Sequence, residues 1–65
     1  MDREEIAKKL VTLRGKRKQH EIANKLGISN SAYSSYETGE RIPSDEVKIK
    51  IAALYKKSVQ YIFFS

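Results

Sequence analysis

Cysteine and tryptophan are absent from this 65-residue sequence, and histidine and proline each occur once. Without cysteine the chain forms neither a disulfide framework nor a thiolate metal site, and one histidine alone does not build a metal centre. No apolar run is long enough to cross a bilayer, and the charged beginning MDREEIAKKL does not read as a secretory signal peptide. We therefore expect a cytoplasmic protein with no metal, no cofactor and no membrane segment.

The excess of basic over acidic residues limits the kinds of partner that the chain is expected to bind. Thirteen Lys and Arg residues against eight Asp and Glu residues give a net charge of +5, which suits a polyanionic partner such as nucleic acid or an anionic membrane. The basic residues do not gather opposite one broad aromatic face, which disfavours a membrane surface. Because no nucleophile–base pair, metal cluster or glycine-rich phosphate loop is present, we do not expect an enzyme or catalytic residues.

Apolar residues recur with helical spacing along most of the chain, which predicts an all-α fold in one domain of residues 1–65. A chain this small depends on close helix packing, with or without help from a partner subunit. We expect Ile42 to enter the core, held extended by Pro43, and Lys48 to be solvated. The expected helices cover residues 2–14, 19–26, 30–38, 45–55 and 59–64, and each of the three glycines directly follows one of them.

Residues 19–39 organise the rest of the chain, because they read as two short helices joined by a tight turn. Gly27 ends the first of these helices, since glycine adopts the left-handed conformation without a Cβ penalty. Ser29 begins the second as an N-cap, whose hydroxyl accepts an unpaired backbone N–H. This arrangement predicts a helix-turn-helix unit with residues 30–38 as a recognition helix in the DNA major groove.

The expected recognition helix presents an outward face of small, uncharged polar side chains. Short hydroxyl and amide groups allow close approach to base edges, and asparagine pairs bidentately with adenine. The alternative interpretation is a serine-rich helix face that is simply exposed to solvent. The candidate base-contacting residues are Asn30, Ser31, Ser34 and Ser35.

A short basic link, residues 15–18, precedes the second expected helix. Its backbone N–H groups and dipole attract an anion at the helix N-terminus. Lys18 occupies the N-cap position and has no acceptor to offer, but its charge reinforces a phosphate site that Gln19 also reaches with its amide. Arg41, in the loop after the recognition helix, is a further phosphate contact. The alternative interpretation of the link is a solvated turn.

Several groups of spaced residues agree in register with one known family. They are Gln19-x-Glu21-Ile22-Ala23-x-x-Leu26-Gly27-Ile28-Ser29, Ser31-x-Tyr33-x-x-Tyr36-Glu37-x-Gly39, Ile42-Pro43-Ser44 and Ser58-Val59-x-Tyr61-Ile62-Phe63. With these residues the chain resembles, over essentially its whole length, the Cro/C1-type (XRE-like) helix-turn-helix regulators of phages and bacteria. The resemblance implies a compact five-helix, lambda-repressor-like domain with its third helix in the major groove.

The resemblance also assigns roles to individual residues. It implies base contacts for Asn30, Ser31 and Ser35, with Ser34 as a further candidate, and phosphate contacts for the residues Gln19, Thr38 and Arg41. It further implies a structural ion pair between Arg14 and Glu37. Two features depart from the family pattern: the link before the second helix is shorter than in many members, and Lys18 replaces the common Ser or Thr cap.

Two functions remain as alternatives at this point. The favoured one is a DNA-binding transcriptional regulator, a Cro-like repressor that binds a palindromic operator as a homodimer through Tyr61 and Phe64. The other is an antitoxin or similar interaction module that neutralises a partner protein through the same aromatic residues, with DNA binding secondary. A partly packed C-terminus would equally account for these two aromatic residues.

Overall fold

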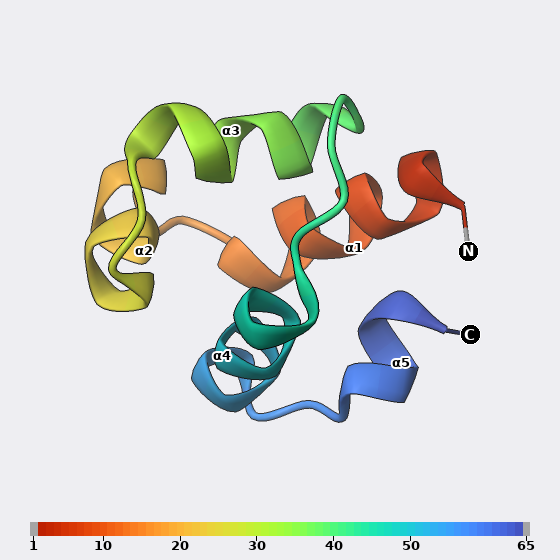
Figure 1. Cartoon of the computed structure of the whole chain (residues 1–65). Helices are drawn as coiled ribbons and strands as arrows, with labels where there is room; N and C mark the ends of the chain where they lie inside the picture. The colour runs from red at the N-terminus through yellow and green to blue at the C-terminus, as the bar shows by residue number, and fades with distance from the viewer. Residues whose placement is uncertain (1, 65) are drawn as a thin grey trace.

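The structure, a computed structural model, describes residues 2–64 and folds them into five helices with no strand in that range (Figure 1). The predicted all-α, five-helix fold is therefore confirmed. The bounds differ from expectation only at two ends: Asp2 caps α1 rather than joining it, and α5 stops one residue earlier. The helices are α1 (Arg3–Arg14), α2 (Gln19–Leu26), α3 (Asn30–Thr38), α4 (Asp45–Tyr55) and α5 (Val59–Phe63).

Local sequence accounts for most of the helix ends. Ser29, Ser44 and Ser58 are the N-caps of α3, α4 and α5, and each hydroxyl accepts the backbone N–H three residues later. Gly27 and Gly39 end α2 and α3 in the left-handed region, with φ values of 73° and 82°. Because these signals stand in the sequence itself, they fix where α2 ends and where α3 begins and ends.

The core draws buried side chains from all five helices. α1 packs along α3 on one side and against α5 on the other, and α2 contacts both α3 and α4 (Figure 1). Full burial of one Leu, Ile or Phe side chain contributes about 1.5–3 kcal/mol, so the cluster of buried side chains in the core supplies most of the stabilisation. The buried cluster consists of Ile6, Leu10, Ile22, Ala23, Leu26, Tyr33, Tyr36, Ile51, Ala52, Tyr55, Ile62 and Phe63.

The loop between α3 and α4 corrects one sequence-based expectation. Ile42 does not enter the core: its side chain is 37% exposed, whereas Pro43 is buried. In an extended segment successive side chains point to opposite sides, so only one of two neighbouring residues faces inward. The ring of Pro43 takes that place, and Ile42 lines a surface hollow with Arg3 and Gly39.

Lys48 is a second residue for which the expectation was wrong. It is 7% exposed rather than solvated. Its ammonium group lies 5.8 Å and 5.0 Å from the ring centres of Phe63 and Phe64, and 3.5 Å from Asp45. The long side chain lies against the two aromatic rings, and its charged end is paired with Asp45.

Candidate nucleic-acid interface

The α2–α3 unit forms a tight turn that leaves α3 on the outer edge of the molecule (Figure 1). The backbone N–H of Gly27 donates to the carbonyl oxygen of Asn24, and that of Ile28 donates to the carbonyl oxygen of Ala23. Both N···O distances are 3.1 Å. Ile28 is half-buried against the core and Ala23 is 2% exposed. Two backbone hydrogen bonds and the burial of apolar side chains thus hold the turn, and α3 begins directly after it.

The polar face of α3 divides into two parts. Asn30 and Ser31, in the first turn, are exposed, whereas Ser34 and Ser35 are half-buried. The Ser35 hydroxyl donates to the carbonyl oxygen of Ala32 at 2.6 Å, so its hydrogen is already engaged within the helix. The first turn therefore offers the side chains most accessible to a base edge.

The start of α2 lies beside the last turn of α3. Lys18 is exposed at the N-cap and makes no side-chain capping bond. The amide of Gln19, expected to reach a phosphate, instead donates to Glu37 Oε1 at 2.8 Å. The Gln19 side chain thus ties α2 to α3. The backbone N–H groups in the first turn of α2 and the ammonium group of Lys18 remain as the groups that attract a phosphate at this helix N-terminus.

The loop after α3 carries the remaining expected phosphate contacts. Arg41 is exposed. The Thr38 hydroxyl lies 3.2 Å from the Ser35 carbonyl oxygen and 3.3 Å from a carboxylate oxygen of Glu40. Arg3 donates from the first residue of α1 to the Glu40 carbonyl at 3.2 Å, which braces the loop. A carboxylate beside Thr38 repels a phosphate, so Arg41 is the stronger anion-binding candidate of the two.

Glu37 of α3 is the polar centre that joins three helices, because it accepts hydrogen bonds from Arg14 of α1 and Gln19 of α2. Arg14 grips it with two nitrogens, Nε at 2.7 Å from Oε2 and Nη2 at 3.1 Å from Oε1, while Gln19 adds a third donor. The Glu37 side chain is 3% exposed and that of Arg14 is 20% exposed. A carboxylate this deeply buried stays charged only because its hydrogen-bond donors take the place of water.

Two opposing effects act on the pKa of Glu37. Burial raises the pKa, and hydrogen bonds from Arg14, Gln19 and Tyr33 lower it more strongly, so the net shift is below the ordinary 4.5. In turn, the hydrogen bond to Glu37 is the main reason why the pKa of Arg14 is raised. The pair is therefore fully ionised at neutral pH.

The aromatic residues at the C-terminal end are exposed as expected, Tyr61 to 49% and Phe64 to 54%. Tyr61 has the Lys9 and Lys57 ammonium groups 5.2 Å and 5.4 Å from its ring centre. Ile49 of α4 is 63% exposed and lines a hollow with Phe64. In the sequence Ile49 already falls off the apolar stripe of this helix, which agrees with its exposure.

Residues 2–64 contain neither a metal-binding cluster nor a membrane-spanning helix. No group of three or more His, Cys, Asp or Glu side chains there is arranged to hold a metal ion. No helix among them is both long and apolar enough to cross a membrane.

The fold and the α2–turn–α3 geometry together define a helix-turn-helix DNA-binding domain. A family model described as Helix-turn-helix matches residues 6–62, and the chain belongs to that family, of the Cro/C1 (XRE-like) type predicted from its motifs. The chain is thus a DNA-binding helix-turn-helix regulator, in a family that is generally non-enzymatic. No curated protein and no solved structure matched it.

Proposed function

We propose that the chain is a transcriptional repressor that binds a palindromic operator as a homodimer, with α3 of each copy in the major groove. The exposed first turn of α3, with Asn30 and Ser31 beside the helix-turn-helix turn, is the observation that carries the proposal. Lys18 and Arg41 supply phosphate contacts that set the register, and the α3 face supplies discrimination between bases. Two copies read half-sites roughly 34 Å apart, and occupancy of the operator blocks polymerase.

Replacing Asn30 with Ala is expected to weaken binding to a duplex selected from a random DNA pool by about 1–3 kcal/mol, the cost of one lost base contact. Binding to a mixed-sequence duplex should change little, because phosphate contacts dominate there. Fluorescence anisotropy with both duplexes measures the difference. Thr12→Ala is the matched control, since Thr12 is an exposed, uncharged polar residue of α1 outside the α2–α3 unit. An equal loss on both duplexes would contradict the assignment of Asn30 to base recognition.

A homodimer is the second element of the proposal. The double variant Tyr61→Ala/Phe64→Ala is expected to raise the dimer dissociation constant at least about tenfold, equivalent to roughly 1.4 kcal/mol of lost association free energy. Both side chains are about half exposed, so their removal leaves the core intact. Sedimentation velocity at several concentrations measures the shift. Val11→Ala, at another exposed apolar residue, is the control, and a wild-type profile for the double variant would remove Tyr61 and Phe64 from the interface.

The alternative function is an antitoxin-like module that neutralises a partner protein. The exposed apolar side chains of Ile49 and Phe64 favour it as much as they favour a homodimer. Recovery of the chain as a tight complex with a second protein, together with a monomeric state when purified alone, would support this alternative over the homodimeric repressor.

A further inference from the structure

One of the three cationic residues in the exposed link between α1 and α2, Arg17, has its guanidinium engaged with the protein itself. The guanidinium carbon of Arg17 lies 5.2 Å from the ring centre of Tyr55, in a cation–π contact with α4. Its Nη2 donates to the carbonyl oxygen of Leu13 at 2.8 Å, and its Nε to that of Arg14 at 3.2 Å. These carbonyls belong to the last turn of α1, so Arg17 also places a cation at the negative end of the helix dipole.

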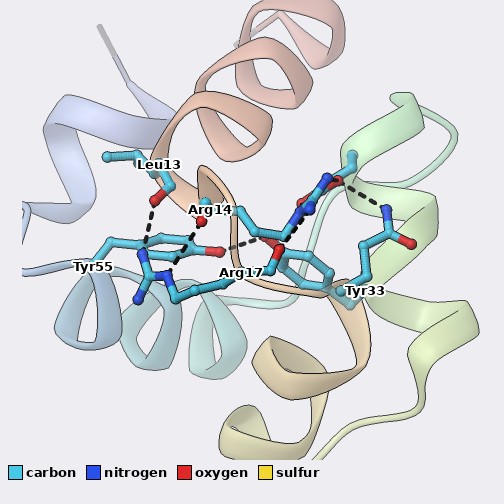
Figure 2. Close-up of polar contacts among 7 residues, drawn as sticks. Leu13, Arg14, Arg17, Tyr33 and Tyr55 are labelled. Carbon is cyan, nitrogen blue, oxygen red and sulfur yellow. Dashed lines mark hydrogen bonds and ion pairs between the residues drawn. The ribbon is translucent and has the colours of Figure 1, made fainter.

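Arg14 holds the same link residue from the other side. Its Nη1 donates to the carbonyl oxygen of Arg17 at 2.7 Å, while its other two nitrogens bind Glu37. Each arginine side chain therefore binds the backbone of the other, as Figure 2 shows. Because Lys18 and Gln19 follow at once, this reciprocal clamp fixes the backbone that enters α2.

The ring on which Arg17 rests is itself held in the core. Tyr55 is 7% exposed, and its hydroxyl oxygen lies 2.6 Å from that of Tyr33 on α3. The Arg17 side chain thus connects the end of α1 to α4 and, through Tyr55, to the recognition helix. All three cationic residues of the link are exposed. Arg17 nevertheless directs its donors to α1 carbonyls and its charge to an α4 ring.

We propose that Arg17 is a positioning residue for DNA binding, which fixes the backbone entering α2 and does not itself contact a phosphate. The inference rests on the proposed function, in which the N-terminus of α2 faces the DNA backbone. An ordered link presents the N–H groups of α2 and the Lys18 ammonium in their binding geometry before DNA arrives. DNA binding then does not have to order this segment. The affinity is higher because the conformational entropy of the link is not lost on binding.

The clamp is tested first in the free protein, by amide hydrogen exchange. The N–H groups of Glu21 and Ile22 both donate to the Lys18 carbonyl and report on the first turn of α2. In Arg17→Ala their exchange should accelerate about tenfold relative to Ile62 in α5, because local opening becomes easier without global unfolding. Arg17→Lys should behave similarly, since lysine lacks the planar fork that reaches both carbonyls. Unchanged relative exchange in both variants would overturn the proposal.

The second arm measures affinity for a short mixed-sequence duplex across a salt series, at a temperature where each variant is folded by circular dichroism. Arg17→Ala should bind about fivefold more weakly, reflecting the cost of ordering one further residue on binding. Its salt slope should match wild type, whereas Lys18→Ala should lose roughly 0.9 from the slope, the value for one phosphate.

Three results in the salt series separate the possible failures. A reduced slope in Arg17→Ala, with Arg17→Lys close to wild type, would make Arg17 a phosphate contact and overturn the proposal. Unchanged affinity of folded Arg17→Ala would confine the residue to fold stability and also overturn it. A wild-type chain that binds no duplex would refute the proposed function instead, and positioning for DNA binding would fall with it even if the exchange results held.

Discussion

Replacing Arg14 with Ala is expected to destabilise the domain by about 3 kcal/mol at neutral pH, because removal of one partner leaves the other charge buried and uncompensated. The Glu37 side chain is 3% exposed and would retain Gln19 as a donor but lose both guanidinium bonds. A chain of this length is stabilised by roughly 3–10 kcal/mol in total, so the loss is a large share of it. Urea unfolding followed by circular dichroism measures the change.

Three further variants identify the cause of that loss. Arg3→Ala is the control, because it removes an exposed arginine that makes one hydrogen bond to the Glu40 carbonyl. The double variant Arg14→Met/Glu37→Gln should recover part of the stability, since no charge is then stranded. If Arg14→Met/Glu37→Gln were no more stable than Arg14→Met alone, lost packing rather than the stranded carboxylate would explain the effect.

The pH dependence of the same variant has a definite sign. In the wild type the pKa of Glu37 is lower in the folded chain than its ordinary 4.5, so its stabilisation is present above that pH and is lost as pH falls through the folded value. Without Arg14, burial dominates and protonation of Glu37 relieves the stranded charge. The difference in unfolding free energy between wild type and Arg14→Ala should therefore begin to shrink above pH 4.5, as Glu37 protonates in the variant, and shrink further below 4.5, as the wild type loses its own stabilisation.

The helices could be predicted closely because their start and stop signals are local. Ser29 and Gly27 act on the backbone within a few residues of themselves, so no tertiary information is needed to place the turn between them. The resemblance to the helix-turn-helix family then predicts which of these helices, α3, lies on the outer edge of the molecule. Ile42 shows the limit of this reasoning, because an apolar residue beside Pro43 has two directions to face and only the packed fold decides between them.

The polar details of the site could not be predicted in the same way. Lys, Arg and Gln residues read as solvated because their long side chains usually are, and only tertiary geometry turned Gln19 onto Glu37 and Arg17 onto Tyr55. Asn30 and Ser31 were identified from position and chemistry, and they are exposed in the fold. Their small side chains make too few contacts for the operator sequence to follow from them.

Raising the pH above 10 is expected to unfold the domain through two buried tyrosines. Burial is the main cause that raises the pKa of Tyr33 and of Tyr55 above the ordinary 10.0; their mutual hydrogen bond adds to the rise for Tyr33 and opposes it for Tyr55. Both therefore stay neutral in the folded chain while they ionise in the unfolded chain. Stability is fully present below pH 10 and falls above it, by about 1.4 kcal/mol per pH unit for each such tyrosine.

The alkaline transition is measured by circular dichroism and tyrosinate absorbance in the same titration. Part of the absorbance should rise only together with the loss of helix, because Tyr33 and Tyr55 ionise on unfolding. Tyr33→Phe removes one titrating group, so the fall in stability per pH unit should become shallower by about 1.4 kcal/mol. Full tyrosinate absorbance while the helices remain intact would show that the Tyr33–Tyr55 pair is open to water, and the link that rests on Tyr55 would then lack its anchor.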